Sequence, residues 1–378
     1  MAQTKLKTGL VSLMIAGVAT ILVVQNQAQI KLRAENQSLR QQMAKLQTEN
    51  ERLSKHPRTP RLPAPPMQAT APTYAPAADL QLTNLYDRFK DKEPKLTAEQ
   101  VEAYLKANGR KASSLLAAYR TSGDPALLKE AMEKYPNDPQ VAFEAVFDKD
   151  LSPEEQRQWL NTFKQSAPDN ALGNYLSALN YFNSGQIDQG VQELTAASGK
   201  GFDDYTLERG QDDEEAYLSA GYSAAEADRI SLPSLTLPQL APLKRLGQDL
   251  VALANAYGQS GDQTSAQAAL QMAVNLGQRY GDASASVTLI GPLVGMAIER
   301  MALNAMDPNS PYGGNGQTVQ GQLNQIAQQE AALRQLGQQV GPLLPTLSDQ
   351  DWINYENRKM IFGEASAIQW LVSKYGRQ

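Results

Sequence analysis

The chain has 378 residues, with 35 Lys or Arg, 40 Asp or Glu, one His and no Cys, so its formal net charge is −5 at pH 7. The lack of cysteine excludes disulfides, thiol nucleophiles and cysteine–metal sites. A single histidine, His56, likewise excludes serine–histidine triads and clusters of histidine ligands.

The first predicted element is a transmembrane helix at residues 8–25. No Asp, Glu, Lys or Arg occurs between Thr8 and Ile30, and the mostly apolar residues 8–24 reach roughly 26 Å as a helix, enough for a thin bilayer core. Lys5 and Lys7 precede this run, which places residues 1–7 in the cytoplasm. The sequence therefore predicts a single-pass protein of the inner (plasma) membrane with an extracytoplasmic, periplasmic distal part.

A signal peptide cleaved within residues 1–19 is the alternative, because a basic start and an apolar core fit it equally well. Cleavage near Gly17 or Ala19 would leave the apolar Ile21–Val24 at the mature N-terminus. The uncleaved anchor is therefore favoured.

The second predicted element is a coiled coil at residues 26–54, in which leucine recurs every seven residues. The d positions are Leu32, Leu39, Leu46 and Leu53, and the intervening a positions are Asn36, Met43 and Asn50. Leucine at d favours two parallel strands, and asparagine at a penalises other registers. We expect a parallel homodimer, with a single amphipathic helix packed on its own domain as the alternative.

The residues before the zipper are membrane-like rather than basic, which argues against nucleic-acid binding. A membrane helix followed by a short zipper resembles small bacterial division proteins of the septal scaffold and the shape-determining protein with a membrane helix and coiled coil. This resemblance covers residues 1 to about 54 and concerns architecture, so it indicates the bacterial envelope but no activity.

A proline-rich linker follows at residues 55–78, with seven prolines between Ser54 and Ala78. Proline blocks helix and favours extended backbone, which predicts a semi-rigid spacer. The charge also changes sign here. Residues 1–78 hold ten Lys or Arg against three Asp or Glu, a net +7, and residues 79–378 hold 25 against 37, a net −12. An acidic distal domain is expected to repel nucleic acid.

Residues 79–378 are predicted to be all-α, as one domain or as two with a sub-boundary near 200–243. Capping boxes are expected at Thr97 with Gln100, Ser152 with Glu155 and Ser223 with Glu226. Later helices are expected near Ile290–Met306, Gln317–Val340 and Asp349–Tyr375, with a turn-rich loop at 307–316 and no sheet. The last helix is expected to dock through Trp352, Tyr355, Ile361, Phe362, Ile368, Trp370 and Leu371.

Two segments resemble tetratricopeptide repeats, in which small residues let antiparallel helices approach. The better copy carries Leu250, Leu253, Ala254, Tyr257, Ala266, Leu270 and Ala273, and the second carries Ala178, Tyr181, Gly185, Gly190, Leu194 and Ala197. A shorter match lies at Leu116, Tyr119 and Gly123. The copies are not contiguous, so we expect an irregular tetratricopeptide-like domain, with a plain helical bundle as the alternative.

Residues 203–215 are acid-rich and leave weak cation binding or carboxylate catalysis open, although such runs are usually solvated loops. We expect no catalytic, cofactor or metal site. The leading hypothesis is a membrane-anchored, non-enzymatic scaffold or adaptor whose helical-repeat groove binds a protein or peptide partner. The alternatives are a structural cell-envelope protein that acts through its coiled coil and spacer, and, third, a carboxylate-dependent glycosidase.

Overall fold

The computed structural model describes residues 94–281, 287–313 and 316–376, all within the unit that spans residues 75–378. Fifteen α-helices account for 74% of residues 94–376, which confirms the all-α prediction for this part of the chain. The predicted transmembrane helix, coiled coil and linker lie outside the described residues. Within residues 94–281, 287–313 and 316–376, no helix has both the length and the hydropathy of a membrane span.

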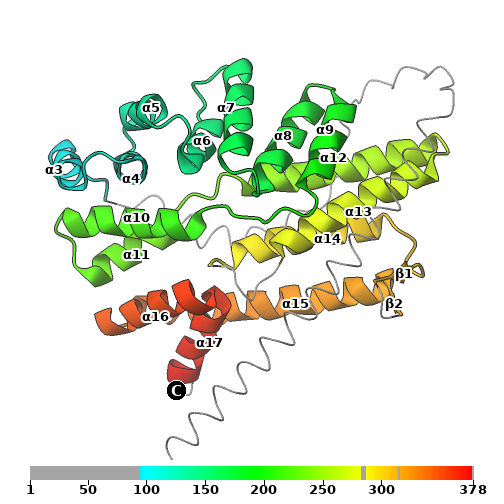
Figure 1. Cartoon of the computed structure of the whole chain (residues 1–378). Coiled ribbons are helices and arrows are strands. Elements are labelled where there is room, and N and C mark those ends of the chain that lie inside the picture. The colour runs from blue at the N-terminus through cyan, green and yellow to red at the C-terminus, as the bar shows by residue number, and fades with distance from the viewer. Residues whose placement is uncertain (1–93, 282–286, 314–315, 377–378) are drawn as a thin grey trace, which may run out of the picture. The chain divides into compact units, whose positions relative to one another are not determined.

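The helices of this unit form three layers (Figure 1). The first layer contains α3 (Ala98–Asn108), α4 (Ala112–Ser122), α5 (Pro125–Lys134), α6 (Pro139–Val146), α7 (Pro153–Ser166), α8 (Leu172–Asn183) and α9 (Ile187–Ala197). The second contains α10 (Thr206–Ser219), α11 (Ala224–Ser234), α12 (Leu240–Gln259), α13 (Gln263–Tyr280) and α14 (Ile290–Asn304). The third contains β1 (Pro311–Tyr312), β2 (Gln317–Thr318), α15 (Val319–Val340), the 3₁₀ turn η1 (Leu344–Thr346), α16 (Asp349–Phe362) and α17 (Glu364–Tyr375).

Contacts between sequence-distant helices join the layers. Helix α10 packs on α3 and α4, and α12 packs on α8. Helix α11 contacts α16, and α14 contacts α15. Most other contacts join consecutive helices as hairpins, which is consistent with a helical-repeat-like fold.

The predicted helix starts are confirmed at all three capping boxes. The hydroxyls of Thr97, Ser152 and Ser223 accept hydrogen bonds from the backbone amides three residues later. In return, the side chains of Gln100, Glu155 and Glu226 accept the backbone amides of these cap residues. Each box satisfies amide donors that have no partner inside the helix.

Two predicted features differ from the structure. The single helix expected over 349–375 is divided into α16 and α17 at Gly363, whose φ of 82° and ψ of 158° are not helical. The loop at 307–316 also contributes to a small antiparallel hairpin, in which β1 pairs with β2 and Tyr312 lies opposite Gln317. Its strands have two residues each, too short to show an alternating pattern.

Helices α13 and α14 cross at very short range at two glycines. A Cβ built on Gly277 would lie 2.7 Å from the carbonyl oxygen of Gly295, and one on Gly295 would lie 2.4 Å from the amide nitrogen of Gly281. Backbone atoms cannot yield as a flexible side chain does. Both positions therefore require glycine, because any side chain would collide with the backbone of the facing segment.

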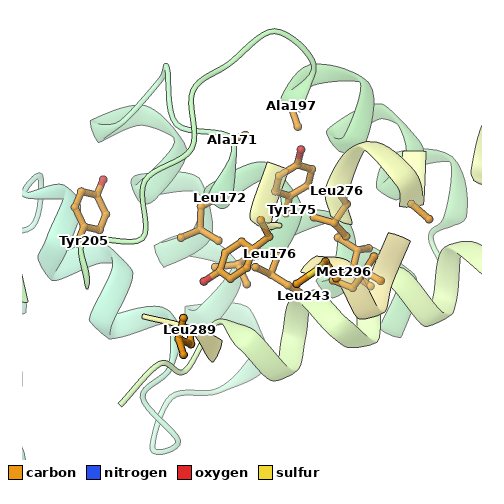
Figure 2. Close-up of a cluster of buried hydrophobic side chains, with 14 of the residues drawn as sticks. Ala171, Leu172, Tyr175, Leu176, Ala197, Tyr205, Leu243, Leu276, Leu289 and Met296 are labelled. Carbon is orange, nitrogen blue, oxygen red and sulfur yellow. The ribbon is translucent and has the colours of Figure 1, made fainter. Parts of the chain in front are cut away.

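The described residues of this unit form two large hydrophobic cores. The smaller one is built by α3, α4 and α5, with Val141 of α6, Ala216 and Tyr217 of α10, and Ala227 of α11. The larger one joins α6–α9 to α12–α17, and Figure 2 shows side chains of α8, α12, α13 and α14 meeting in it. Residues 200–243, where a sub-boundary was expected, therefore hold a hairpin that packs into the smaller core.

Candidate functional site

The predicted repeat residues of the better copy lie on the hairpin α12–α13. Five of its seven positions are buried, namely Leu250, Ala254, Ala266, Leu270 and Ala273, and Leu253 and Tyr257 are half-buried. Ala254 packs in a small cluster with Ala269 and Leu270, against the partly buried Met306. These residues hold two antiparallel helices together.

The second copy lies on α8–α9, where Ala178, Gly190, Leu194 and Ala197 are buried, Tyr181 is half-buried, and Gly185, in the turn, is exposed. A Cβ on Gly190 would lie 2.2 Å from the Phe182 ring, so the absence of a side chain permits this hairpin. In the short match, Leu116 is buried in α4, Tyr119 is half-buried and Gly123 ends the helix. The predicted dimerisation residues, Leu32 to Leu53, lie outside the described residues.

Helix α10 packs on α4 and is joined to α4 and α6 by buried ion pairs. Arg120 of α4 donates to Asp213 of α10 at 2.8 Å and to Glu144 of α6 at 3.0 Å. Arg209 of α10, which has no exposed surface, donates to the same Glu144 oxygen at 2.9 Å. Two arginines and two carboxylates thus form a buried four-residue network that fixes α10.

Burial and pairing act against each other within this network. Burial opposes ionisation of Glu144, but Arg209 and Arg120 outweigh it and hold the pKa of this carboxyl below its usual value. Burial dominates at Asp213 and raises its pKa to about 6, although Arg120 opposes the shift. The arrangement positions a helix rather than a reacting group.

The expectation that residues 203–215 form a solvated loop is wrong for most of the segment. Residues 206–215 belong to α10, and Asp213 is buried in the network with Arg120. In the described ranges, no group of three or more His, Cys, Asp or Glu residues is arranged to hold a metal ion.

The strongest candidate for an interaction surface lies where α16 meets α17. Ile361 and Phe362 are large apolar residues with 70% and 55% of their surfaces exposed. Arg358 lies one helical turn before them, and its guanidinium carbon is 4.9 Å from the centre of the half-buried Trp370 ring. We call Arg358, Ile361, Phe362, Trp370 and Lys374 the α16–α17 patch.

The edge of this patch is held in place by α16 and α17 together. The Lys374 ammonium lies 5.4 Å from the centre of the Trp370 ring and also pairs with Asp351 of α16. The Tyr375 hydroxyl donates to the other oxygen of Asp351. Two cations near the Trp370 ring, with the exposed apolar side chains of Ile361 and Phe362 on the same helix as Arg358, can bind an apolar segment that carries carboxylates.

The expectation that all seven apolar residues of this segment dock was wrong for Ile361 and Phe362. Trp352, Tyr355, Ile368 and Leu371 are buried as expected. For Ile361, helical phase carried the missed signal. At 100° per residue Ile361 lies about 180° from Trp352, which faces the core.

Comparisons with known proteins identify no relative, because no family model, no curated protein and no solved structure matches the chain.

Proposed function

We propose that the protein is a membrane-anchored, non-enzymatic scaffold whose α16–α17 patch binds a protein partner outside the cytoplasm. The anchor is the helix at residues 8–25, and a coiled coil at 26–54 pairs two copies in parallel. The linker at 55–78 holds the distal domain away from the membrane. In that domain, α8–α9 and α12–α13 are tetratricopeptide-like repeats.

The observation that carries the proposal is the outward position of Ile361 and Phe362. Exposing two large apolar side chains side by side forgoes the stabilisation of burial, about 1.5–3 kcal/mol for each. Contiguous apolar exposure of this kind is typical of interaction sites, whereas isolated apolar side chains on a surface are ordinary.

The cations beside the patch indicate the chemistry of the partner. Arg358 and Lys374 both lie near the Trp370 ring, so the patch fits an aliphatic segment with carboxylates at its edges. The distal domain as a whole has a net charge of −12, and a partner with these carboxylates is drawn to this local positive region rather than to the rest of the surface.

Photo-cross-linking in intact cells tests the proposal. A full chain with Phe362→p-benzoylphenylalanine keeps an aromatic ring at the patch, and Gln259→p-benzoylphenylalanine places the same group at an exposed position of α12. We expect irradiation to give one discrete heavier adduct with a second protein from position 362 and none from position 259. Arg358→Glu should lower the yield of that adduct.

Adducts of equal yield from both positions, or no adduct from either, would contradict the proposal. An adduct that contains only a second copy of the chain would instead support the structural envelope role that the coiled coil and spacer suggest.

A further inference from the structure

The contact between α11 and α16 is one of the places where the two cores meet, and ionisable side chains gather there. We call this contact, with the adjoining ends of α10 and α17, the α11–α16 seam. Its ionisable residues are Glu214 of α10, Asp228 of α11, Glu356 and Lys359 of α16, and Glu364 of α17. All but the half-buried Glu214 are at least nine-tenths buried.

The seam has more acids than bases. Four carboxyl groups surround one ammonium, so full ionisation would leave a net charge of −3 in a buried region. The Lys359 ammonium is 3.4 Å from an oxygen of Glu356, yet neither Glu356 oxygen has a hydrogen-bond donor among the described residues. A buried carboxylate with a long ion pair and no hydrogen-bond donor is costly, and a bound proton lowers that cost.

A second proton is required between Glu214 and Asp228. Their carboxyl groups share a hydrogen bond, which needs one of them protonated. Burial and the neighbouring Asp228 raise the pKa of Glu214 to about 7, so Glu214 is the donor. Burial likewise raises the pKa of Glu356 to about 7, although Lys359 opposes it.

The other charged and polar groups at the seam have partners of their own. Arg229 of α11 pairs with Asp349 of α16 at 2.6 Å and lies over the Trp352 ring. Glu364 accepts the backbone amide of Leu289 at 2.5 Å and the Tyr355 hydroxyl at 3.3 Å. Lys359 is therefore the one buried cation among the described groups that faces Glu356 and Asp228.

We propose that the α11–α16 seam is a proton-operated latch, closed when Glu214 and Glu356 are protonated and opened by their deprotonation. In an open seam the pKa values of Glu214 and Glu356 would return to the ordinary value near 4.5, whereas in the closed seam they are about 7. Between these two pH values the closed seam therefore binds two more protons than an open one. The raised folded-state pKa values mean that closure is favoured at low pH and is lost as the pH rises through about 7. Each proton changes the opening equilibrium by up to about tenfold per pH unit in this window.

The latch concerns the domain itself and does not depend on the proposed partner. Helix α16 also carries Ile361 and Phe362, so opening would change how the α16–α17 patch lies relative to the smaller core. Regulation of the patch by pH would follow.

Distance measurements between two spin labels test the latch in the full chain. The protein has no native cysteine, so Ala224→Cys on α11 and Asn357→Cys on α16 give two unique labelling positions, both exposed. Mixing with excess unlabelled chain removes distances between copies. A control pair, Ala252→Cys and Gln267→Cys, lies at exposed positions of α12 and α13, away from the seam.

We expect a narrow distance distribution for the α11–α16 pair at pH 5 and a longer, broader one at pH 8, with the control pair unchanged. Glu214→Gln with Glu356→Gln supplies neutral side chains of the same shape, so this variant should stay narrow at both pH values. Identical distributions at pH 5 and pH 8 would overturn the latch. So would a control pair that broadens in parallel, or a glutamine variant that opens at pH 8 as the parent does.

Discussion

Small side chains set the spacing between α12 and α13 at the residue scale. Ala254 is 3% exposed and packs with Ala269 and Leu270, with Leu253 and Met306 at the edge of the cluster. Because protein interiors are close-packed, a side chain buried in such a cluster has no free space beside it for additional atoms.

Ala254→Phe should therefore destabilise the distal domain by about 1–3 kcal/mol, because it adds an aromatic ring to a filled contact. Thermal unfolding followed by circular dichroism should show a melting temperature lowered by several degrees. Gln259→Ala, at an exposed position of the same helix, should leave the melting temperature nearly unchanged. Equal melting temperatures for the two variants would remove the support for repeat packing at residues 247–279.

Single residues were predictable where their partners are close in sequence. The Ser152 hydroxyl caps its helix by accepting the backbone amide of Glu155, three residues later, and this spacing alone identifies the cap. The burial of Arg209 was not predictable, because Glu144, with which it pairs, lies 65 positions away. Charged residues are usually exposed, so a sequence gives no sign of a buried pair until the fold joins its members.

At the element scale, the division between α16 and α17 depends on Gly363. Its amide donates to the carbonyl of Lys359 at 2.9 Å, and its own carbonyl accepts the amide of Ala367 at 3.2 Å. The residue thus ends one helix and begins the next, with a φ of 82° that residues with a Cβ rarely adopt. Ile361 and Phe362, both exposed, are the last two residues of α16 before this change of direction.

Gly363→Ala should destabilise the domain by about 1–3 kcal/mol, because alanine is strained in this conformation. Gly258→Ala is the matched control, since its backbone is helical and a Cβ there meets no atom within 4 Å. The control should be neutral or slightly stabilising in chemical denaturation. An unfolding midpoint for Gly363→Ala equal to that of the parent would show that α16 and α17 do not need a glycine between them.

The helices themselves were largely predictable, because α14 and α15 begin and end within a few residues of the expected ranges. The packing of the hairpin α10–α11 was not predictable, because its apolar residues are buried in the core that α3–α5 build. Periodicity indicates that a helix exists, but the surface that it will cover depends on contacts distant in sequence.

At the scale of the whole molecule, the α11–α16 seam and the tether, by which we mean the predicted anchor, coiled coil and linker, depend on separate parts of the chain. The seam follows from buried carboxyl groups on α10, α11, α16 and α17, whereas the tether is a prediction from residues 1–78. A membrane anchor and a parallel coiled coil would hold two distal domains close to each other and raise the effective concentration for a partner with two binding segments.

Labelling with a membrane-impermeant maleimide tests most directly the central claim, that the α16–α17 patch is presented outside the cytoplasm. The chain has no native cysteine, so Ile361→Cys, at a position 70% exposed, and Gln3→Cys, in the predicted cytoplasmic segment, each supply a single thiol. In cells with a permeabilised outer membrane and an intact inner membrane, we expect Ile361→Cys to be labelled at once and Gln3→Cys only after lysis. Protection of Ile361→Cys in the intact state, together with labelling of Gln3→Cys, would contradict the account.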